Sequence, residues 1–228
     1  MNICIIPARS GSKRVKKKNI KNFLGKPIIY YPIREAIKSK LFKNIIVSTD
    51  SDEIIKISKK FGAEVFFKRS KKLSKNNVST QKIVKNEISK LKKINLKFDN
   101  ICCIYPTAVL LKAKHLKKSF NSFKKSKKNF LFSAQKFISP PQRALIRKKG
   151  KIQMMNPKNY FIQSNNLEKT YHDAGQFYWG DTNSWTNEKI VFSKKSDIYI
   201  LPFLEAIDIN YKEDWKIAEF LYKNHKKI

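Results

Sequence analysis

Short apolar runs alternate with polar turns and amphipathic stretches along most of the chain. The spacing predicts helices over residues 28–40, 50–61, 79–93, 112–125 and 211–224, and strands over 3–7, 44–49, 64–67, 100–105, 130–135, 176–179 and 198–201. Alternation of strand with helix is typical of a parallel sheet that is covered by helices on both faces. The pattern therefore predicts an α/β fold with a doubly wound, mostly parallel sheet.

The run over residues 100–105 is apolar at consecutive positions, which is typical of a strand in the middle of a parallel sheet. Its adjacent Cys102 and Cys103 should point to opposite faces of that strand. Together with Cys4, they form no spacing typical of metal ligands. We interpret all three cysteines as small buried apolar residues.

The alternation stops over residues 139–166, where Pro140, Pro141, Gly150 and Pro157 punctuate the chain. Residues 151–155 show the period of two that is typical of a strand. We expect a small β-excursion here, which covers a substrate or makes a dimer contact. The whole chain, residues 1–228, is expected to form one domain.

No apolar run approaches the length of about 18 residues that a membrane helix needs. The amino terminus lacks a positive segment ahead of its short apolar run, so it does not resemble a signal peptide. We expect no membrane partner and a cytoplasmic location.

The chain is strongly basic, with 50 Lys and Arg residues against 17 Asp and Glu and a formal net charge of +33. Such a charge suggests a nucleic-acid or membrane-surface partner. However, the lysines recur in nearly every predicted helix, which favours a lysine-rich solvated surface, and no nucleic-acid partner is expected. A basic nucleic-acid-binding protein stays as the alternative of another class, and it predicts tight RNA or DNA binding with a steep salt dependence.

A basic loop follows the first predicted strand, at the edge of the sheet where α/β proteins bind ligands. Gly11 and its flanking serines can aim backbone N–H groups at phosphate oxygens, and Arg9, Lys13 and Lys18 add positive charge. The loop matches neither the dinucleotide motif nor the P-loop motif. It predicts a triphosphate cradle; a solvated basic turn is the alternative.

Several segments resemble a known family. The sequence PARSGSKRVKKKN (residues 7–19), the turn Gly25-Lys26-Pro27 and residues 46–50 resemble the CMP-sugar synthetases that activate sialic acids and related ulosonic acids. The segment YHDAGQFYWG (171–180) and residues 102–108 are most similar to pseudaminic acid cytidylyltransferases. The resemblance spans essentially the whole chain and implies a Rossmann-like nucleotidyltransferase fold.

The implied enzyme condenses CTP with an acidic nine-carbon sugar, pseudaminic acid by first choice, to give a CMP-sugar and pyrophosphate for a surface glycan or flagellin. A synthetase for CMP-N-acetylneuraminate, CMP-legionaminate or CMP-ketodeoxyoctonate is the alternative within the class. Family habit also implies a homodimer.

The resemblance implies catalytic roles for Arg9, Lys18 and Asp208. The implied nucleotide-binding residues are Ala8, Arg9, Ser10, Gly11, Ser12, Lys13, Lys18, Asn19, Arg69, Val78 and Tyr105. The implied sugar-binding residues are Tyr105, Gln142, Arg143, His172, Asp173, Gln176 and Tyr178. Ordinary alternatives are core packing for Tyr178, a surface loop for Gln142 and Arg143, and turn capping for Asp173. Asp50 and Asp52 are assigned mainly to helix capping.

The segment 205–215 resembles the family's metal motif. Strand alternation puts Asp208 and Asn210 on one face, where both could bind Mg²⁺, with Mn²⁺ as the second choice. Asn210 departs from the family's aspartate, Asn76 and Asn166 also stand where aspartates are expected, and Val109 replaces a proline. A relative that only binds the nucleotide is therefore a third possibility.

Overall fold

A computed structural model describes residues 1–12 and 14–224; Lys13, a predicted nucleotide-binding residue, lies outside the described residues. The helices are α1 (Tyr30–Ser39), α2 (Asp52–Lys60), α3 (Thr80–Lys93), α4 (Ala113–Ser126), α5 (Thr182–Thr186) and α6 (Lys212–Asn224). The strands are β1 (Asn2–Pro7), β2 (Asn22–Phe23), β3 (Lys26–Pro27), β4 (Asn44–Ser48), β5 (Asn100–Ile104), β6 (Phe130–Lys136), β7 (Leu145–Lys148), β8 (Lys151–Met154), β9 (Tyr171–Asp181) and β10 (Ser196–Ile200).

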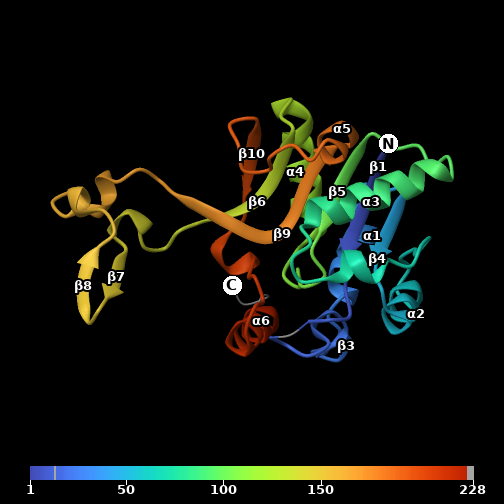
Figure 1. The fold of residues 1–228 in the computed structure, drawn as a ribbon, viewed down its shortest axis with the longest axis horizontal. Coiled ribbons are helices and arrows are strands. Elements are labelled where there is room, and N and C mark those ends of the chain that lie inside the picture. Colours follow the sequence, from blue (N-terminus) through green and yellow to red (C-terminus); the bar gives the residue numbers. More distant parts are fainter. Residues whose placement is uncertain (13, 225–228) are drawn as a thin grey trace.

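A six-stranded sheet in the order β10-β6-β9-β5-β1-β4 forms the centre of the molecule (Figure 1). Strand β1 pairs in parallel with β4 and β5, and β10 pairs in parallel with β6. Strand β9 runs antiparallel to both of its neighbours, β5 and β6. The predicted α/β fold with a mostly parallel sheet is confirmed, but β5 is parallel to its neighbour on one side only.

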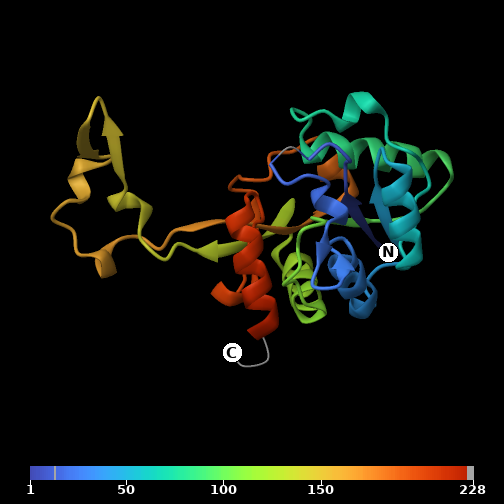
Figure 2. The ribbon, with the colours of Figure 1, turned by 90° about the horizontal axis from the view of Figure 1, so that it is seen from below.

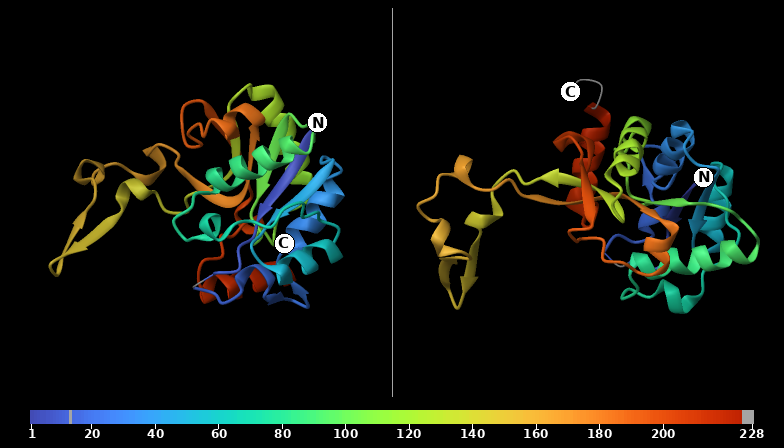
Figure 3. Two further views of the ribbon diagram at one scale, coloured as in Figure 1. Left: turned by 45° about the vertical axis from the view of Figure 1, so that its right-hand side comes forward. Right: turned by 90° about the horizontal axis from the view of Figure 1, so that it is seen from above.

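Helices cover both faces of the sheet (Figure 3). Apolar side chains of α1, α2 and α4 pack on one face, and those of α3 and α5 pack on the other. Cys4 and Cys102 belong to the first of these cores and Cys103 to the second, and all three are fully buried and unpaired. The expected placement of the cysteines is confirmed.

The carboxyl-terminal part of the chain returns to the amino-terminal part. Helix α6 packs through Trp215 and Ala218 in a third apolar cluster that also contains Phe23, between β1 and α1 in the chain, and Val109. Ile209, just ahead of α6, is fully buried in the same cluster. This packing brings residues 208–210 beside the basic loop that follows β1.

Residues 137–170, which we call the arm, stand away from the rest of the molecule (Figures 1 and 2). The antiparallel hairpin β7–β8 lies within the arm, so the predicted β-excursion is present. The arm exposes apolar side chains at its surface, among them Phe161 with 91% and Ile152 with 69% of their areas.

Two predicted elements differ from the structure. The strand expected over residues 64–67 is absent, because Glu64 and Lys68 make only isolated bridges to the region of β4. The strand expected over 176–179 extends over the whole of β9. Among the described residues, no helix is long and apolar enough to span a membrane.

Candidate active site

The carboxyl ends of β1, β4 and β5 meet at one edge of the sheet, as parallel pairing requires. A cavity of about 290 Å³ opens there. Its walls come from the loop after β1, the segment ahead of α3, the end of β5 and the segment ahead of α6. The lining residues are Pro7, Arg9, Ser12, Arg14, Val15, Lys18, Asn19, Arg69, Lys75, Asn76, Val78, Thr80, Ile83, Tyr105, Pro106, Thr107, Asp208 and Asn210.

Hydrogen bonds within the basic loop fix its course. The Ser12 hydroxyl accepts a hydrogen bond from the Lys18 backbone N–H at 2.7 Å, and the Asn19 amide donates to the Arg9 carbonyl at 2.9 Å. Among the predicted nucleotide-binding residues of this loop, Arg9, Ser12, Lys18 and Asn19 line the cavity, whereas Ala8, Ser10 and Gly11 do not. The backbone N–H of Ala8 is already bonded to Ser48.

Asp50 braces this loop, and its assignment as a helix cap is wrong. Its two carboxylate oxygens accept hydrogen bonds from the backbone N–H and the hydroxyl of Ser10, each at 2.8 Å. Burial alone would raise the pKa of Asp50, but these bonds from Ser10 hold it below its usual value. Ser51 caps α2, and Asp52 lies in the first turn and pairs with Lys68.

Arg9 reaches across the cavity to the segment ahead of α3. Its guanidinium donates to the Asn76 amide oxygen and, at 3.5 Å, to the Ser74 carbonyl. Asn76 stands where an aspartate is expected, so this contact leaves the charge of Arg9 uncompensated. Within the described part of the chain, Arg9 has no carboxylate partner, and its charge is available to an anion in the cavity.

Arg69 is buried at the back of the cavity, with an exposed fraction of 3%. Its Nε donates to the Ser74 hydroxyl at 3.1 Å, while Nη1 and Nη2 are buried without a hydrogen-bond partner. Burial lowers the pKa of Arg69, and nearby Asp50 and Glu87 partly offset this. Because unpaired buried donors cost free energy, this guanidinium suits a ligand that carries acceptors.

The two ends of the chain meet at Lys18 and Asp208. The Lys18 ammonium donates to the Ile209 carbonyl at 2.6 Å, and Asn210 donates its amide N–H to the Asp208 carboxylate at 2.6 Å. Burial lowers the pKa of Lys18, and neighbouring Asp208 opposes that shift. With Ile209 buried between them, Asp208 and Asn210 line the same cavity, although the strand expected around these residues is absent.

The donor set at Asp208 and Asn210 suits a hard cation. A carboxylate and an amide oxygen are ligands that Mg²⁺ accepts, and Mg²⁺ commonly takes one or two carboxylates together with substrate phosphates and water. Nearby Asp214 is occupied elsewhere, because it accepts hydrogen bonds from the backbone N–H groups of Asn210 and Tyr211. Among residues 1–12 and 14–224, no group of three or more His, Cys, Asp or Glu side chains forms a complete protein site for a metal.

A second cavity of about 300 Å³ adjoins the first and shares Thr80 and Tyr105 with it. The Tyr105 hydroxyl lies 3.0 Å from the Thr80 hydroxyl. Asp173 and Tyr178 line the second cavity, and the Tyr178 hydroxyl donates to the Asp173 carboxylate. Asp173 also accepts the Gly175 N–H at 2.9 Å, so it caps a turn as well.

The residues that form the apolar wall of this second cavity were not predicted from the sequence. The residues that form it are Trp185, Ile190, Val191 and Phe192. The run Ile190-Val191-Phe192 has no partner in a regular strand, so only its apolar character ahead of β10 could have indicated a contact surface.

Four predicted sugar-binding residues line neither cavity. Gln176 is almost fully buried, and its amide donates to the carbonyls of Ala174 and Ile207. His172 is exposed and packs against the ring of Phe137. Gln142 and Arg143 lie in the arm.

The profile of a family described as "Cytidylyltransferase" matches residues 3–223. The chain is 41% identical to the pseudaminic acid cytidylyltransferase of Campylobacter jejuni, over 99% of this chain and 98% of that protein. It is 30% identical to the CMP-N,N'-diacetyllegionaminic acid synthase of the same species, over 96% and 94% of the two chains.

Among solved structures, the fold is similar to that of a CMP:2-keto-3-deoxy-manno-octonic acid synthetase complexed with CTP. The TM-score is 0.73 with 12% sequence identity, over 98% of this chain and 99% of that chain. The nearly complete coverage by the family profile, together with these relatives, shows that the chain belongs to the cytidylyltransferase family.

Proposed function

We propose that the protein transfers the cytidylyl group of CTP to an acidic nine-carbon sugar, with pseudaminic acid as the preferred substrate, and releases pyrophosphate. The observation that carries the proposal is the single cavity that joins Arg9 and Lys18 of the basic loop to Asp208 near the other end of the chain. The similarity to the Campylobacter jejuni enzyme favours pseudaminic acid over other nonulosonic acids.

The cytosine lies against Arg69 and the triphosphate lies along Arg9, Ser12 and Lys18. The sugar occupies the second cavity beside Tyr105, Asp173 and Tyr178. Its anomeric hydroxyl attacks the α-phosphorus and gives up its proton to solvent water. A new oxygen–phosphorus bond forms, the bond between the α-phosphorus and the β-phosphate oxygen breaks, and pyrophosphate leaves. Phosphoryl transfer depends mainly on positioning and charge neutralisation, and Arg9 and Lys18 provide both.

A divalent cation, Mg²⁺ by first choice and Mn²⁺ by second, would be held by Asp208 and Asn210 and would neutralise charge on the phosphates. Asn210 brings no charge of its own, so Asp208 supplies the only formal negative charge of this pair. Lys18 holds the adjacent backbone through Ile209.

We further propose that the enzyme works in the cytoplasm as a homodimer in which a second copy covers the arm. The exposed apolar side chains of the arm, led by Phe161, suit such a contact. Gln142 and Arg143 would then approach the sugar site of the partner, where a guanidinium can bind the sugar carboxylate.

Incubation of the protein with CTP, Mg²⁺ and one sugar at a time tests the proposal. The panel holds pseudaminic, legionaminic, N-acetylneuraminic and ketodeoxyoctonic acids, and pyrophosphate release is measured. Release should be fastest with pseudaminic acid. CTP binding with no release for any sugar would instead identify a relative that only binds the nucleotide.

Arg9→Ala and Asp208→Ala should abolish turnover and leave the fold intact. The matched controls are Lys125→Ala in α4 and Asp197→Ala, both at exposed positions outside the two cavities and outside the arm, and both should keep full activity. An active Asp208→Ala enzyme would refute the role of this carboxylate.

A further inference from the structure

The segment that carries Asp208 has almost no regular structure of its own. Between β10 and α6, residues 201–211 contain only one short 3₁₀ helix, Phe203–Glu205. No strand pairs with this segment, so a backbone ladder does not fix the position of Asp208. Side chains from other elements must do so.

Buried amide side chains hold the backbone of this segment. Gln135, at the end of β6, donates to three of its carbonyls, those of Pro202 at 3.2 Å, Phe203 at 2.9 Å and Ala206 at 3.4 Å. Gln176 of β9 donates to the Ile207 carbonyl at 3.1 Å. These bonds tie the segment to the sheet.

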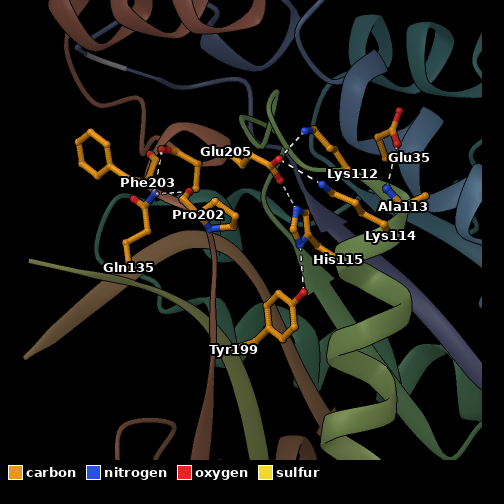
Figure 4. Close-up of polar contacts among 11 residues, drawn as sticks. Glu35, Lys112, Ala113, Lys114, His115, Gln135, Tyr199, Pro202, Phe203 and Glu205 are labelled. Atoms are coloured by element: carbon orange, nitrogen blue, oxygen red, sulfur yellow. Dashed lines mark hydrogen bonds and ion pairs between the residues drawn. The ribbon is translucent and has the colours of Figure 1, made fainter. Parts of the chain in front are cut away.

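One ionic cluster ties the segment to α4 (Figure 4). The Glu205 carboxylate accepts hydrogen bonds from Lys112 at 2.6 Å and Lys114 at 3.1 Å, and also contacts Nε2 of His115. Nδ1 of His115 lies 3.0 Å from the Tyr199 hydroxyl in β10. The side chain of His115 is 6% exposed and that of Glu205 is 17% exposed, so water screens the cluster only weakly.

The protonation states in the cluster follow from its surroundings. Burial lowers the pKa of His115, so the ring is neutral near pH 7 and Nε2–H donates to Glu205 while the Tyr199 hydroxyl donates to Nδ1. Burial alone would raise the pKa of Glu205, but the bonds from Lys112, His115 and Lys114 lower it to about 2. Glu205 is therefore an anion that three donors hold in place.

Glu205 and its partners His115 and Tyr199 line neither the nucleotide cavity nor the sugar cavity. They therefore lie outside the proposed nucleotide and sugar sites. Glu205 is, however, three residues ahead of Asp208 on the same irregular segment. Any effect on catalysis must pass through the backbone of that segment.

We propose that Glu205 is a positioning residue for Asp208, because its bonds to Lys112, Lys114 and His115 fix the irregular segment that places the Asp208 carboxylate in the nucleotide cavity. The inference rests on the proposed function. Loss of the anchor frees the segment, and Asp208 loses its geometry toward the phosphates and their cation while Arg9 and Arg69 keep theirs.

Three variants test this role: Glu205→Gln, Lys112→Gln and the control Glu188→Gln. Glu205→Gln keeps the shape and removes the charge. Lys112→Gln removes one partner of Glu205 and leaves the other two. Glu188→Gln breaks a more exposed ion pair, with Lys85 at 2.8 Å, in another part of the surface.

For Glu205→Gln we expect kcat to fall and the Mg²⁺ concentration for half-maximal activity to rise, each by about 10-fold, as for other changes that disturb metal-site geometry. The KM for CTP should stay within about 2-fold, because the residues that bind the base and triphosphate are untouched. Lys112→Gln should change kcat and the Mg²⁺ dependence in the same directions but by less, and Glu188→Gln should leave both unchanged.

Hydrogen exchange of the ligand-free proteins gives a second measurement that does not depend on activity. Exchange of the amides in residues 203–210 should be faster in Glu205→Gln than in the wild type, with β1 and β5 unchanged. Unchanged kcat, Mg²⁺ dependence and exchange in this segment would overturn the inference. If Glu205→Gln does not fold, the same outcomes in Lys112→Gln decide it.

The wild-type enzyme separates this inference from the proposed function. A wild type that releases no pyrophosphate with any sugar contradicts the function itself. An active wild type whose Glu205→Gln variant behaves identically contradicts the positioning role alone.

Discussion

Arg69 affects both the stability of the ligand-free protein and its affinity for a ligand. Its guanidinium is buried with Nη1 and Nη2 unpaired, which is unfavourable in the ligand-free protein. A base that presents acceptors turns this cost into two charge-assisted hydrogen bonds. If Arg69 binds the cytosine as proposed, the affinity for CTP comes at the expense of the stability of the ligand-free protein.

Replacement of Arg69 by methionine should separate these two effects. CTP binding should weaken by about 10-fold or more, because hydrogen bonds from a charged group are lost. The thermal midpoint of the ligand-free variant should be no lower than that of the wild type, since a buried cation is replaced by an apolar side chain of similar length. Calorimetric titration with CTP and thermal unfolding measure the two quantities. A large loss of stability with unchanged CTP affinity would contradict this view.

The absence of a side chain at Gly175 leaves room for the Asp208 carboxylate. Its φ is +61°, and a Cβ added there would lie 3.2 Å from Cγ of Asp208. Gly175→Ala should therefore lower stability by roughly 1 kcal/mol through backbone strain and also lower kcat by displacing the carboxylate.

Gly150 provides the matched control for this prediction. It has a φ of +78° in the arm, and nothing lies within 4 Å of its added Cβ. Gly150→Ala should show a similar loss of stability with unchanged kcat. Equal kcat values for the two variants would show that the contact with Asp208 is unimportant.

The link between α4 and the segment ahead of Asp208 should depend on pH. Glu205 has a folded-state pKa of about 2, below the ordinary value of 4.5, so its ionised form stabilises the fold. This contribution is complete above about pH 4.5 and is lost as the pH falls toward 2. The contribution of ionised Glu205 to the free energy of unfolding is at most about 3 kcal/mol.

The free energy of urea unfolding, measured from pH 3 to pH 7, tests this dependence. The difference between the wild type and Glu205→Gln should be constant above pH 5 and should shrink as the pH is lowered to 3. A difference that grows on acidification would contradict the assigned direction of the pKa shift.

The elements themselves were largely predictable, because helical spacing and apolar runs are local features. The strand expected over 64–67 did not form, because Val65 and Phe67 pack on the core beside β4 without extending the ladder. A single sequence does not reveal that difference. The direction of β9 was also hidden, since a strand's apolar pattern is the same whether its neighbours are parallel or antiparallel. The link from Glu205 to Lys112 joins residues distant in sequence, and no spacing indicates it.

The site residues show the same difference between local sequence features, which were predictable, and contacts between distant residues, which were not. Residues near Arg9, Lys18 and Asp208 were identified by their motifs, and the structure brings them to one cavity. Asp50 was misassigned, because an acid at a helix start is usually a cap, and only the fold shows Ser10 beside it. The roles of the arm residues stay predictions.

At the scale of the molecule, the arm determines the expected assembly. Phe161→Ser combined with Ile152→Ser removes two of its exposed apolar side chains. Sedimentation should show a dimer for the wild type and a monomer for this variant. The control Phe220→Ser, in which an exposed ring of α6 is changed, should stay dimeric. A dimeric arm variant would place the contact elsewhere.

The net charge of +33 should affect the rate at which substrates bind rather than the rate of the chemical step. Both proposed substrates are anions, and a positive field raises their rate of encounter until salt screens it. We expect kcat/KM for CTP to fall with added salt while kcat stays constant. RNA that displaces CTP with a steep salt dependence would instead support the nucleic-acid-binding alternative.

The meeting of Lys18 with Ile209 and Asp208 has a consequence for biosynthesis. A ribosome makes the basic loop well before the segment around Asp208. A growing polypeptide therefore carries groups that attract nucleotide long before it has the carboxylate needed to use it. Activity should emerge only after the segment around Asp208 has been made, and stop codons ahead of that segment should leave products that are inert as catalysts.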